Sequence, residues 1–233
     1  MRVRIKFSKH GVVKFIGHLD FMRYFQKAIR RSGIDVTYSS GFSPHQIMSF
    51  ASPLGVGHCS NGDYFDIEVN SHNGRQDMID RLNQSMVPGV KVENIVALGE
   101  KAGNAMASVA AAGYTLEWKD GYEVPSNLEE AVSKFFGQES IMVTKQTKKS
   151  TLDLDLKPGI YEIEATADSI YMLVDASSSG NIKPTLLLEA FYSFIGKEFD
   201  PLAIQITREE TYTDIGKNGK RELVPLDAVG EGF

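Results

Sequence analysis

The sequence predicts an α+β fold of two ferredoxin-like lobes, each with an antiparallel sheet and the element order βαββαβ. Three observations predict it. Residues 2–8 and 64–69 alternate polar and apolar side chains, which is typical of strands with one buried face. Residues 18–32 carry apolar side chains at helical spacing. A similar order of elements then recurs in the second half of the chain, although no sequence identity links the two halves.

The first lobe is expected over residues 1–98, with a loop insert at 39–62. Its clearest helix spans 18–32, and Gly33 is a suitable end for it. The predicted core stripe of this helix is Leu19, Met22, Phe25 and Ile29. The other expected elements are strands at 2–8, 34–39, 47–51, 64–69 and 90–96, and an amphipathic helix at 75–86.

The second lobe is expected over residues 99–233. Helices are predicted at 128–136, after the start signal at 125–127, and at 184–194, which begins with Pro184. The predicted strands are 114–119, 141–147, 151–156, 161–165, 170–175 and 203–209. The tail from Gly216 is polar and rich in glycine, so we expect it to be loose.

The composition is that of a folded globular protein, and we expect it in the cytosol. Hydrophobic residues make up 42% of the chain, and no apolar run is long enough to span a bilayer. The start alternates charged and apolar residues, so we expect no signal peptide. Cys59 is the single cysteine, which excludes an internal disulfide and a thiolate-held iron–sulfur cluster within the chain. We therefore expect no cofactor in this chain and no association with a membrane.

Charge is distributed unevenly along the chain. Residues 1–50 contain nine Lys or Arg and two Asp, a net charge of +7, whereas the whole chain carries −5. Such a polarised molecule attracts an anionic partner to its basic end. The alternative is that the basic lobe docks against the chain's own acidic part, and the sequence leaves both interpretations open.

The helix predicted at 18–32 presents a basic face. Arg23, Lys27 and Arg31 are four residues apart and share one side, with Arg30 beside them. Like charges at this spacing repel by a few tenths of a kcal/mol per pair. An anion-binding role would explain that cost, and a solvated helix face is the simpler alternative.

The segment 38–45 is the most specific feature of the chain. It inserts a turn-rich loop between two strands, and loops held by a rigid sheet often carry function. Gly41 allows close approach of a ligand to the backbone, and Ser39, Ser40, Ser43 and His45 can donate to an anion. The structural alternative is an irregular loop closed by packing of Phe42.

Together these patterns define a candidate binding set but no catalytic or metal-binding set. His18 joins the binding set because it stands at the helix start, where a phosphate could bind, although a His there is often only a cap. The candidate binding residues are Arg4, His18, Arg23, Lys27, Arg30, Arg31, Tyr38, Gly41, Phe42, Ser43 and His45. A second basic patch is formed by Lys145, Lys148, Lys149 and Lys157, which a solvated turn explains equally well. The chain has no Walker loop, dinucleotide fingerprint or Gly-x-Ser-x-Gly elbow.

Several of these segments resemble the uncharacterised radical-SAM-linked protein family. The segments are Phe15-Ile16-Gly17-His18-Leu19-Asp20-Phe21-Met22-Arg23, Arg30-Arg31-Ser32-Gly33, Tyr38-Ser39-Ser40-Gly41-Phe42-Ser43-Pro44-His45, Pro53-Leu54-Gly55-Val56-Gly57 and Tyr64-Phe65-Asp66-Ile67. In that family the domain is fused to a radical SAM enzyme or encoded beside one. The resemblance therefore implies a bacterial accessory protein whose partner enzyme carries the iron–sulfur cluster and S-adenosylmethionine. It assigns no catalytic residue to this chain.

Three functions follow as hypotheses. The first is a substrate-binding protein that acts with a radical SAM enzyme and holds an anionic substrate such as tRNA or rRNA, for modification or processing. The second is a metal-independent RNA-processing enzyme in which His18 or His45 acts as general acid and base. The third is a purely structural subunit whose basic lobe docks on the enzyme.

Overall fold

The structure, a computed structural model of the protein, describes residues 1–146 and 151–233. Two members of the predicted second basic patch, Lys148 and Lys149, lie outside the described residues. The chain is a mixed α/β protein with a largely antiparallel sheet and, in the described ranges, five α-helices. None of these helices combines the length and the apolar character that crossing a bilayer requires.

The chain divides into two compact units. The first unit comprises residues 1–110 and 208–233, and the inserted unit comprises residues 111–207. This division differs from the boundary expected at residues 98 and 99, because the C-terminal segment returns to the first unit. The strand β10 (Ile204–Asp214) crosses from the inserted unit into the first one.

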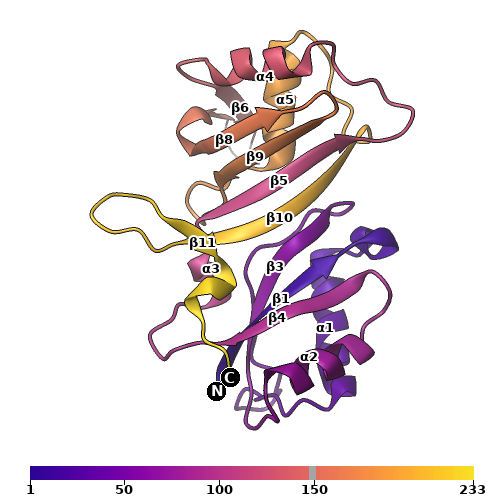
Figure 1. Cartoon of the computed structure of the whole chain (residues 1–233), viewed down its shortest axis with the longest axis vertical. Coiled ribbons are helices and arrows are strands. Elements are labelled where there is room, and N and C mark those ends of the chain that lie inside the picture. The colour runs from indigo at the N-terminus through magenta and orange to yellow at the C-terminus, as the bar shows by residue number, and fades with distance from the viewer. Residues whose placement is uncertain (147–150) are drawn as a thin grey trace. The chain divides into compact units, whose positions relative to one another are not determined.

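The first unit has the element order β-α-β-β-α-β before its C-terminal segment returns. Strand β1 lies between β4 and β3, and β2 pairs with residues 65–67 near the C-terminal end of β3. All three pairings are antiparallel. Helices α1 and α2 cover one face of these strands (Figure 1). The elements are β1 (Arg2–Lys9), α1 (His18–Ser32), β2 (Met48–Phe50), β3 (Cys59–Glu68), α2 (Arg75–Gln84), β4 (Val90–Ala97), α3 (Ala105–Ser108) and β11 (Leu223–Pro225), with 3₁₀ turns at Gly11–Phe15 and Leu226–Val229.

An aromatic cluster forms the core between helix and sheet. The ring of Phe25 from α1 lies 4.8 Å from that of Phe7 and 4.6 Å from that of Phe65, measured between centroids. All three side chains are buried. Gly33 ends α1 in the left-handed conformation with φ of 66°, as the sequence predicted. Leu19 departs from the predicted core stripe, because it is 68% exposed while Phe21 is buried in its place.

The segments around β2 differ from the prediction in extent. Residues 34–39 form no regular strand, and only single bridges join Val36 to Val69 and Tyr38 to Gln46. Strand β3 begins at Cys59, five residues before the expected start. The predicted insert is therefore shorter, and much of it is tied to neighbouring backbone.

The C-terminal tail is packed, contrary to the expectation from its composition. Strand β11 pairs with β10, and the side chain of Leu226 is fully buried. The carboxylate of Asp227 accepts a hydrogen bond from the Tyr64 hydroxyl at 3.0 Å. Local polarity suggested a loose tail, but contacts with residues far away in the sequence hold it on the first unit.

The inserted unit has a small sheet with helices packed on it. Strand β9 lies between β5 and β8 and is antiparallel to both. Helix α5 passes behind these strands and α4 lies beside β8 (Figure 1). Strands β6 and β7 pair antiparallel as a separate two-stranded sheet. The elements are β5 (Ala111–Trp118), α4 (Leu128–Phe136), β6 (Met142–Gln146), β7 (Thr151–Asp155), β8 (Ile160–Ala165), β9 (Ser169–Asp175) and α5 (Pro184–Phe194), with a 3₁₀ turn at Lys157–Gly159.

Candidate functional site

The basic side chains of α1 lie on its solvent face. Arg23, Lys27, Arg30 and Arg31 are all exposed, whereas Phe25 and Ile29 on the opposite side are fully buried. The helix therefore separates its cations from its apolar side chains, as an amphipathic surface helix does.

Two of these four cations make described contacts. Arg23 pairs with Asp20 at 3.0 Å, and both side chains are 71% exposed, so the pair is weak. Arg31 donates to the carbonyl of Ser85 at 2.8 Å. Within the described part of the chain, Lys27 and Arg30 form no ion pair. Most of the positive charge of this face is thus open to a ligand.

The loop at 38–47 lies beside this helix. The amide of Gln46 donates to the carbonyl of Gln26 at 3.2 Å. Gln26 is three residues after Arg23 and four before Arg30, so the three residues share one side of the helix. The loop predicted from its serines and glycine is therefore placed next to the basic face.

The loop presents two aromatic side chains to solvent. Phe42 is fully exposed and Tyr38 is 45% exposed. Gly41 adopts φ of 109°, a conformation that favours glycine, and so forms the turn that carries Phe42. The alternative in which Phe42 packs to close the loop is therefore wrong. We call Arg23, Lys27, Arg30, Arg31, Tyr38 and Phe42 the basic–aromatic surface.

The remaining loop residues of the candidate set support the shape of the loop. The hydroxyl of Ser39 lies 2.9 Å from Nδ1 of His45 and accepts from its backbone N–H at 3.1 Å. Ser43 is exposed near the tip. His45 is exposed as well, so it can still reach a ligand from the base of the loop.

Arg4 does not belong to this surface. Its side chain is fully buried and donates to both carboxylate oxygens of Asp66, at 2.8 and 3.1 Å. It also donates to the carbonyl of Leu226 at 3.0 Å. Arg4 was a candidate because of its charge, but its guanidinium joins β1 to the C-terminal segment and is closed to a ligand.

A second group of ionisable residues lies at the start of α1, where Lys9, Asp63 and Arg208 are buried and His18 is partly buried. We call Lys9, His18, Asp63 and Arg208 the charged cluster. Arg208 binds Asp63 at 2.6 Å, and both side chains are buried. Lys9 is 2% exposed; its Nζ donates to the carbonyl of Ile16 at 2.9 Å and lies 4.5 Å from the ring centre of Phe21.

Burial governs the electrostatics of the charged cluster. It lowers the pKa of the Lys9 amine, and the charge of Asp63 only partly opposes this effect. Burial also lowers the pKa of His18, with further lowering from Lys9 and Arg208 and opposition from Asp63. The imidazole of His18 meets the ring of Phe50 edge-on, 5.6 Å between centroids.

Three members of the charged cluster, Lys9, His18 and Asp63, line a small hollow, and the fourth, Arg208, holds the loop that borders it. Arg208 donates to the carbonyls of Ser52 at 3.3 Å and Pro53 at 3.1 Å. Lys9, His18, Ser52 and Asp63 contribute the polar lining of the hollow. This arrangement can offer hydrogen-bond donors to an incoming oxygen atom.

Sequence reasoning missed Lys9 and Asp63 as members of this cluster. Their positions in the strands could have revealed them. Lys9 is two residues after Phe7 and Asp63 is two before Phe65, so each is expected on the same face of its strand as a core phenylalanine. A charged residue at a position that alternation assigns to the core needs a buried partner. Only the fold shows that Arg208, about 145 residues after Asp63, is that partner.

The histidines of the candidate set do not form one centre. His18 belongs to the charged cluster, whereas His45 bonds to Ser39 in the loop. In the described residues no hydrogen bond or ring contact joins the two. Nor do three or more His, Cys, Asp or Glu side chains gather there as a metal site would require.

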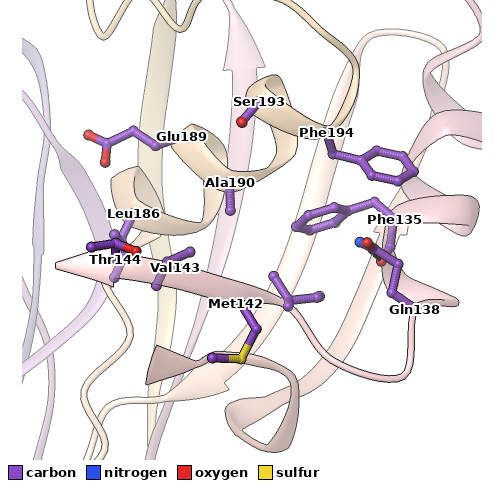
Figure 2. Close-up of a pocket in the computed structure, with 11 residues that line it drawn as sticks. Phe135, Gln138, Met142, Val143, Thr144, Leu186, Glu189, Ala190, Ser193 and Phe194 are labelled. Carbon is purple, nitrogen blue, oxygen red and sulfur yellow. Dashed lines mark hydrogen bonds between the residues drawn. The ribbon is translucent and has the colours of Figure 1, made fainter. Parts of the chain in front are cut away.

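A further hollow lies in the inserted unit between α4, α5 and β6 (Figure 2). The rings of Phe135 and Phe194 stand 5.6 Å apart at one end, and Leu186 and Ala190 face Val143. No residue of the candidate set falls in it.

Comparison with known proteins adds the family. The model of a family of uncharacterised proteins conserved in bacteria, DUF2344, matches residues 2–184. The comparison with curated proteins gave no match. The matched residues include α1, the loop at 38–47 and all of the charged cluster except Arg208. Because the match covers most of its length, this chain belongs to the DUF2344 family of uncharacterised bacterial proteins.

Proposed function

We propose that this chain is an accessory protein that holds an anionic substrate, RNA in particular, for a partner enzyme. The observation that carries the proposal is the basic–aromatic surface, on which exposed cations of α1 stand beside exposed aromatic rings. Arg and Lys bind phosphates, while rings such as Phe42 stack on unpaired bases. A single-stranded or looped RNA, in tRNA or rRNA for example, matches both features.

The partner and the wider architecture belong to the same proposal. The sequence resemblance supports a radical SAM enzyme as the partner, which would supply the cluster and S-adenosylmethionine in the cytosol. The order of strands in the first unit supports a ferredoxin-like lobe. We propose that the chain consists of two such lobes in tandem.

The alternative of RNA cleavage by His18 and His45 has less support. General acid–base catalysis requires two groups within reach of the same reacting atoms. These two side chains belong to separate parts of the first unit, as described above. Cleavage of RNA by the pure protein without metal, lost in His45→Ala, would favour this alternative.

Binding of total bacterial RNA across a salt series tests the proposal. Wild type is expected to bind with a steep salt dependence, because each phosphate contact releases counterions. The variant Arg23→Glu/Lys27→Glu/Arg31→Glu is expected to lose binding. The matched control is Lys183→Glu/Lys197→Glu/Lys217→Glu, which makes the same change of charge at three other exposed positions.

The control separates a specific surface from net charge. If both triple variants lose binding equally, overall charge rather than the basic–aromatic surface explains it. If wild type fails to bind RNA at low salt, the RNA proposal fails. Salt-sensitive binding to the enzyme without RNA would then favour the purely structural subunit.

A further inference from the structure

The hollow of the inserted unit separates helix α5 from strand β6 (Figure 2). Its volume is about 400 Å³, which lies in the range of ligand sites in proteins. One stripe of α5 faces the hollow, at the spacing of three, four and seven residues that places side chains on one side of a helix. The stripe consists of Leu186, Glu189, Ala190 and Ser193. Because Ala190 is small, the middle of the stripe leaves room between the helix and the strand.

Strand β6 has one edge without a partner strand. Within the described residues β6 pairs with β7 alone. The N–H of Leu156 donates to the carbonyl of Ile141 at 2.9 Å, so these two form a hydrogen-bonded pair. Hydrogen-bonded pairs alternate along an antiparallel ladder, so Met142 and Thr144 direct their N–H and C=O groups away from β7. Both residues line the hollow, as does Val143 between them.

This edge is suited to extended backbone. Met142 and Thr144 together offer two N–H donors and two C=O acceptors to a chain laid beside β6. The side chain of Met142 is 60% exposed and Thr144 is exposed as well, so the edge is open. Proteins commonly cover such an edge with a helix or loop. Here the helix that lies alongside, α5, stands on the other side of the hollow (Figure 2).

The two ends of the hollow differ in chemistry. The rings of Phe135 and Phe194 stand 5.6 Å apart at one end, and Glu189 lies toward Thr144 at the other (Figure 2). Glu189 is exposed and is the one charged side chain of the lining; no described residue forms an ion pair with it. Residues 111–207 as a whole contain fifteen Asp or Glu and eight Lys. Charge complementarity therefore selects a basic residue for the Glu189 end and an apolar residue for the aromatic end.

We propose that the edge of β6 binds an extended segment of a partner protein, which adds to β6 as a further strand between β6 and α5. The segment pairs its backbone with Met142 and Thr144. An apolar side chain of the segment enters the hollow toward Phe135 and Phe194, and a lysine or arginine two residues away meets Glu189. Side chains two residues apart share one face of a strand, as this arrangement requires. The site lies in the inserted unit and does not depend on RNA binding.

The edge favours a polypeptide over a nucleic acid or a small molecule as the occupant. A strand carries N–H and C=O groups at the same repeat as β6, which a phosphate backbone does not. The carboxylate of Glu189 also repels phosphates. A compact small molecule would fill the hollow but leave the outward N–H and C=O groups of Met142 and Thr144 without a partner strand.

Nuclear magnetic resonance of the full chain with labelled methyl groups tests the site. The probe is the acetylated peptide amide Val-Phe-Thr-Lys-Val, which is expected to shift the methyl signals of Met142, Val143 and Ala190. An added strand uses the N–H groups of alternate residues. One derivative is therefore N-methylated at Phe and Lys, and another at Thr and both Val. One of the two is expected to bind about ten-fold more weakly than the probe, and the other to bind as the probe does.

Variants locate the peptide. Ala190→Met fills the middle of the hollow and is expected to abolish the shifts of Met142 and Val143. Ala131→Met, at a partly buried alanine of α4 outside the lining, is the matched control and should bind as wild type does. Glu189→Gln is expected to weaken binding about three-fold, and to bind the probe no better than a derivative with norleucine in place of Lys.

Three outcomes would overturn the strand-addition site. One is equal binding of the two N-methylated derivatives, since a side chain bound alone does not use the backbone. Another is binding that survives Ala190→Met, and the third is the absence of any shift at millimolar peptide. The RNA titration of the Arg23→Glu/Lys27→Glu/Arg31→Glu variant tests the proposed function separately, because that variant leaves the inserted unit unchanged.

Discussion

The basic residues of β1 and those of α1 have opposite roles although they lie within 30 residues of one another. Arg4 and Lys6 of β1 are bonded to Asp66 and Glu210, and Lys9 is buried beneath α1. The cations of α1 are exposed instead. The charge of +7 in residues 1–50 is therefore partly cancelled inside the fold.

The comparison shows what a count of charges measures. Net charge along the sequence does not distinguish a cation that joins strands from one that meets solvent. The buried cations of β1 contribute to the folded state, because an unpaired buried charge is costly. The exposed cations of α1 contribute little to stability and remain available for binding.

The largest expected effect comes from breaking a buried pair. Arg4→Met leaves the buried carboxylate of Asp66 without its cation, which costs about 3–5 kcal/mol in the free energy of unfolding. Urea denaturation followed by circular dichroism measures this loss. The double variant Arg4→Met/Asp66→Leu should recover a large part of it, and a single variant as stable as wild type would refute the structural role of Arg4.

Phe42→Ala is expected to act on binding alone. Loss of one stacked base lowers the RNA affinity by about 1–3 kcal/mol. Since Phe42 is fully exposed, the free energy of unfolding should change by no more than about 0.5 kcal/mol. Tyr122→Ala, at a half-exposed aromatic position in the inserted unit, is the control. Equal losses of affinity in both variants would contradict a specific stacking role.

Lys27→Ala is expected to have a smaller effect, on RNA binding and not on stability, which tests the difference between the exposed cations of α1 and the buried cations of β1. Its expected change in stability is within about 0.5 kcal/mol. If Lys27 contacts one phosphate of single-stranded RNA, the slope of log affinity against log salt should decrease by roughly 0.7. Lys197→Ala should leave the slope unchanged, and a variant slope equal to that of wild type would remove Lys27 from the binding surface.

The smallest effect is a pH dependence from His18. Burial lowers its pKa in the folded state, so the unfolded chain takes up the proton first as the pH falls. The stability of wild type should therefore decrease as the pH falls below about 6.5, the ordinary value for histidine. His18→Gln should show a shallower decrease when unfolding is measured from pH 7.5 to 5. Parallel curves for the two proteins would show that His18 does not contribute.

Local pattern was enough to predict most of the regular elements. The spacing of Phe25 and Ile29 predicted α1, and the alternation around Phe65 predicted β3. The exposed basic face of α1 followed from the same spacing. Because the helices and strands and their order could be predicted in this way, the mixed α/β character with a largely antiparallel sheet was predictable. The tandem ferredoxin-like arrangement stays a prediction.

The features that sequence reasoning missed depend on distant residues. Leu19 has the helical phase of a core residue, but it is 68% exposed in the fold, and periodicity alone does not show which end of a helix is covered. Arg4 looks like a surface charge until Asp66 is paired opposite it, and Lys9 does so until the fold brings it near Asp63 and beneath α1. The polar C-terminal tail is held by the burial of the Leu226 side chain and by the hydrogen bond from Arg4 to the Leu226 carbonyl, which joins residues 222 positions apart.

The return of the chain to the first unit sets an order of events during translation. Residues 1–110 leave the ribosome before Arg208 and Leu226 exist, so the nascent first unit holds Asp63 and Arg4 without those partners. At roughly 5–20 residues per second, synthesis of the inserted unit delays completion by about 5 to 20 s. A fragment that stops at residue 184, where the family match ends, would keep the chain in this unfinished state permanently.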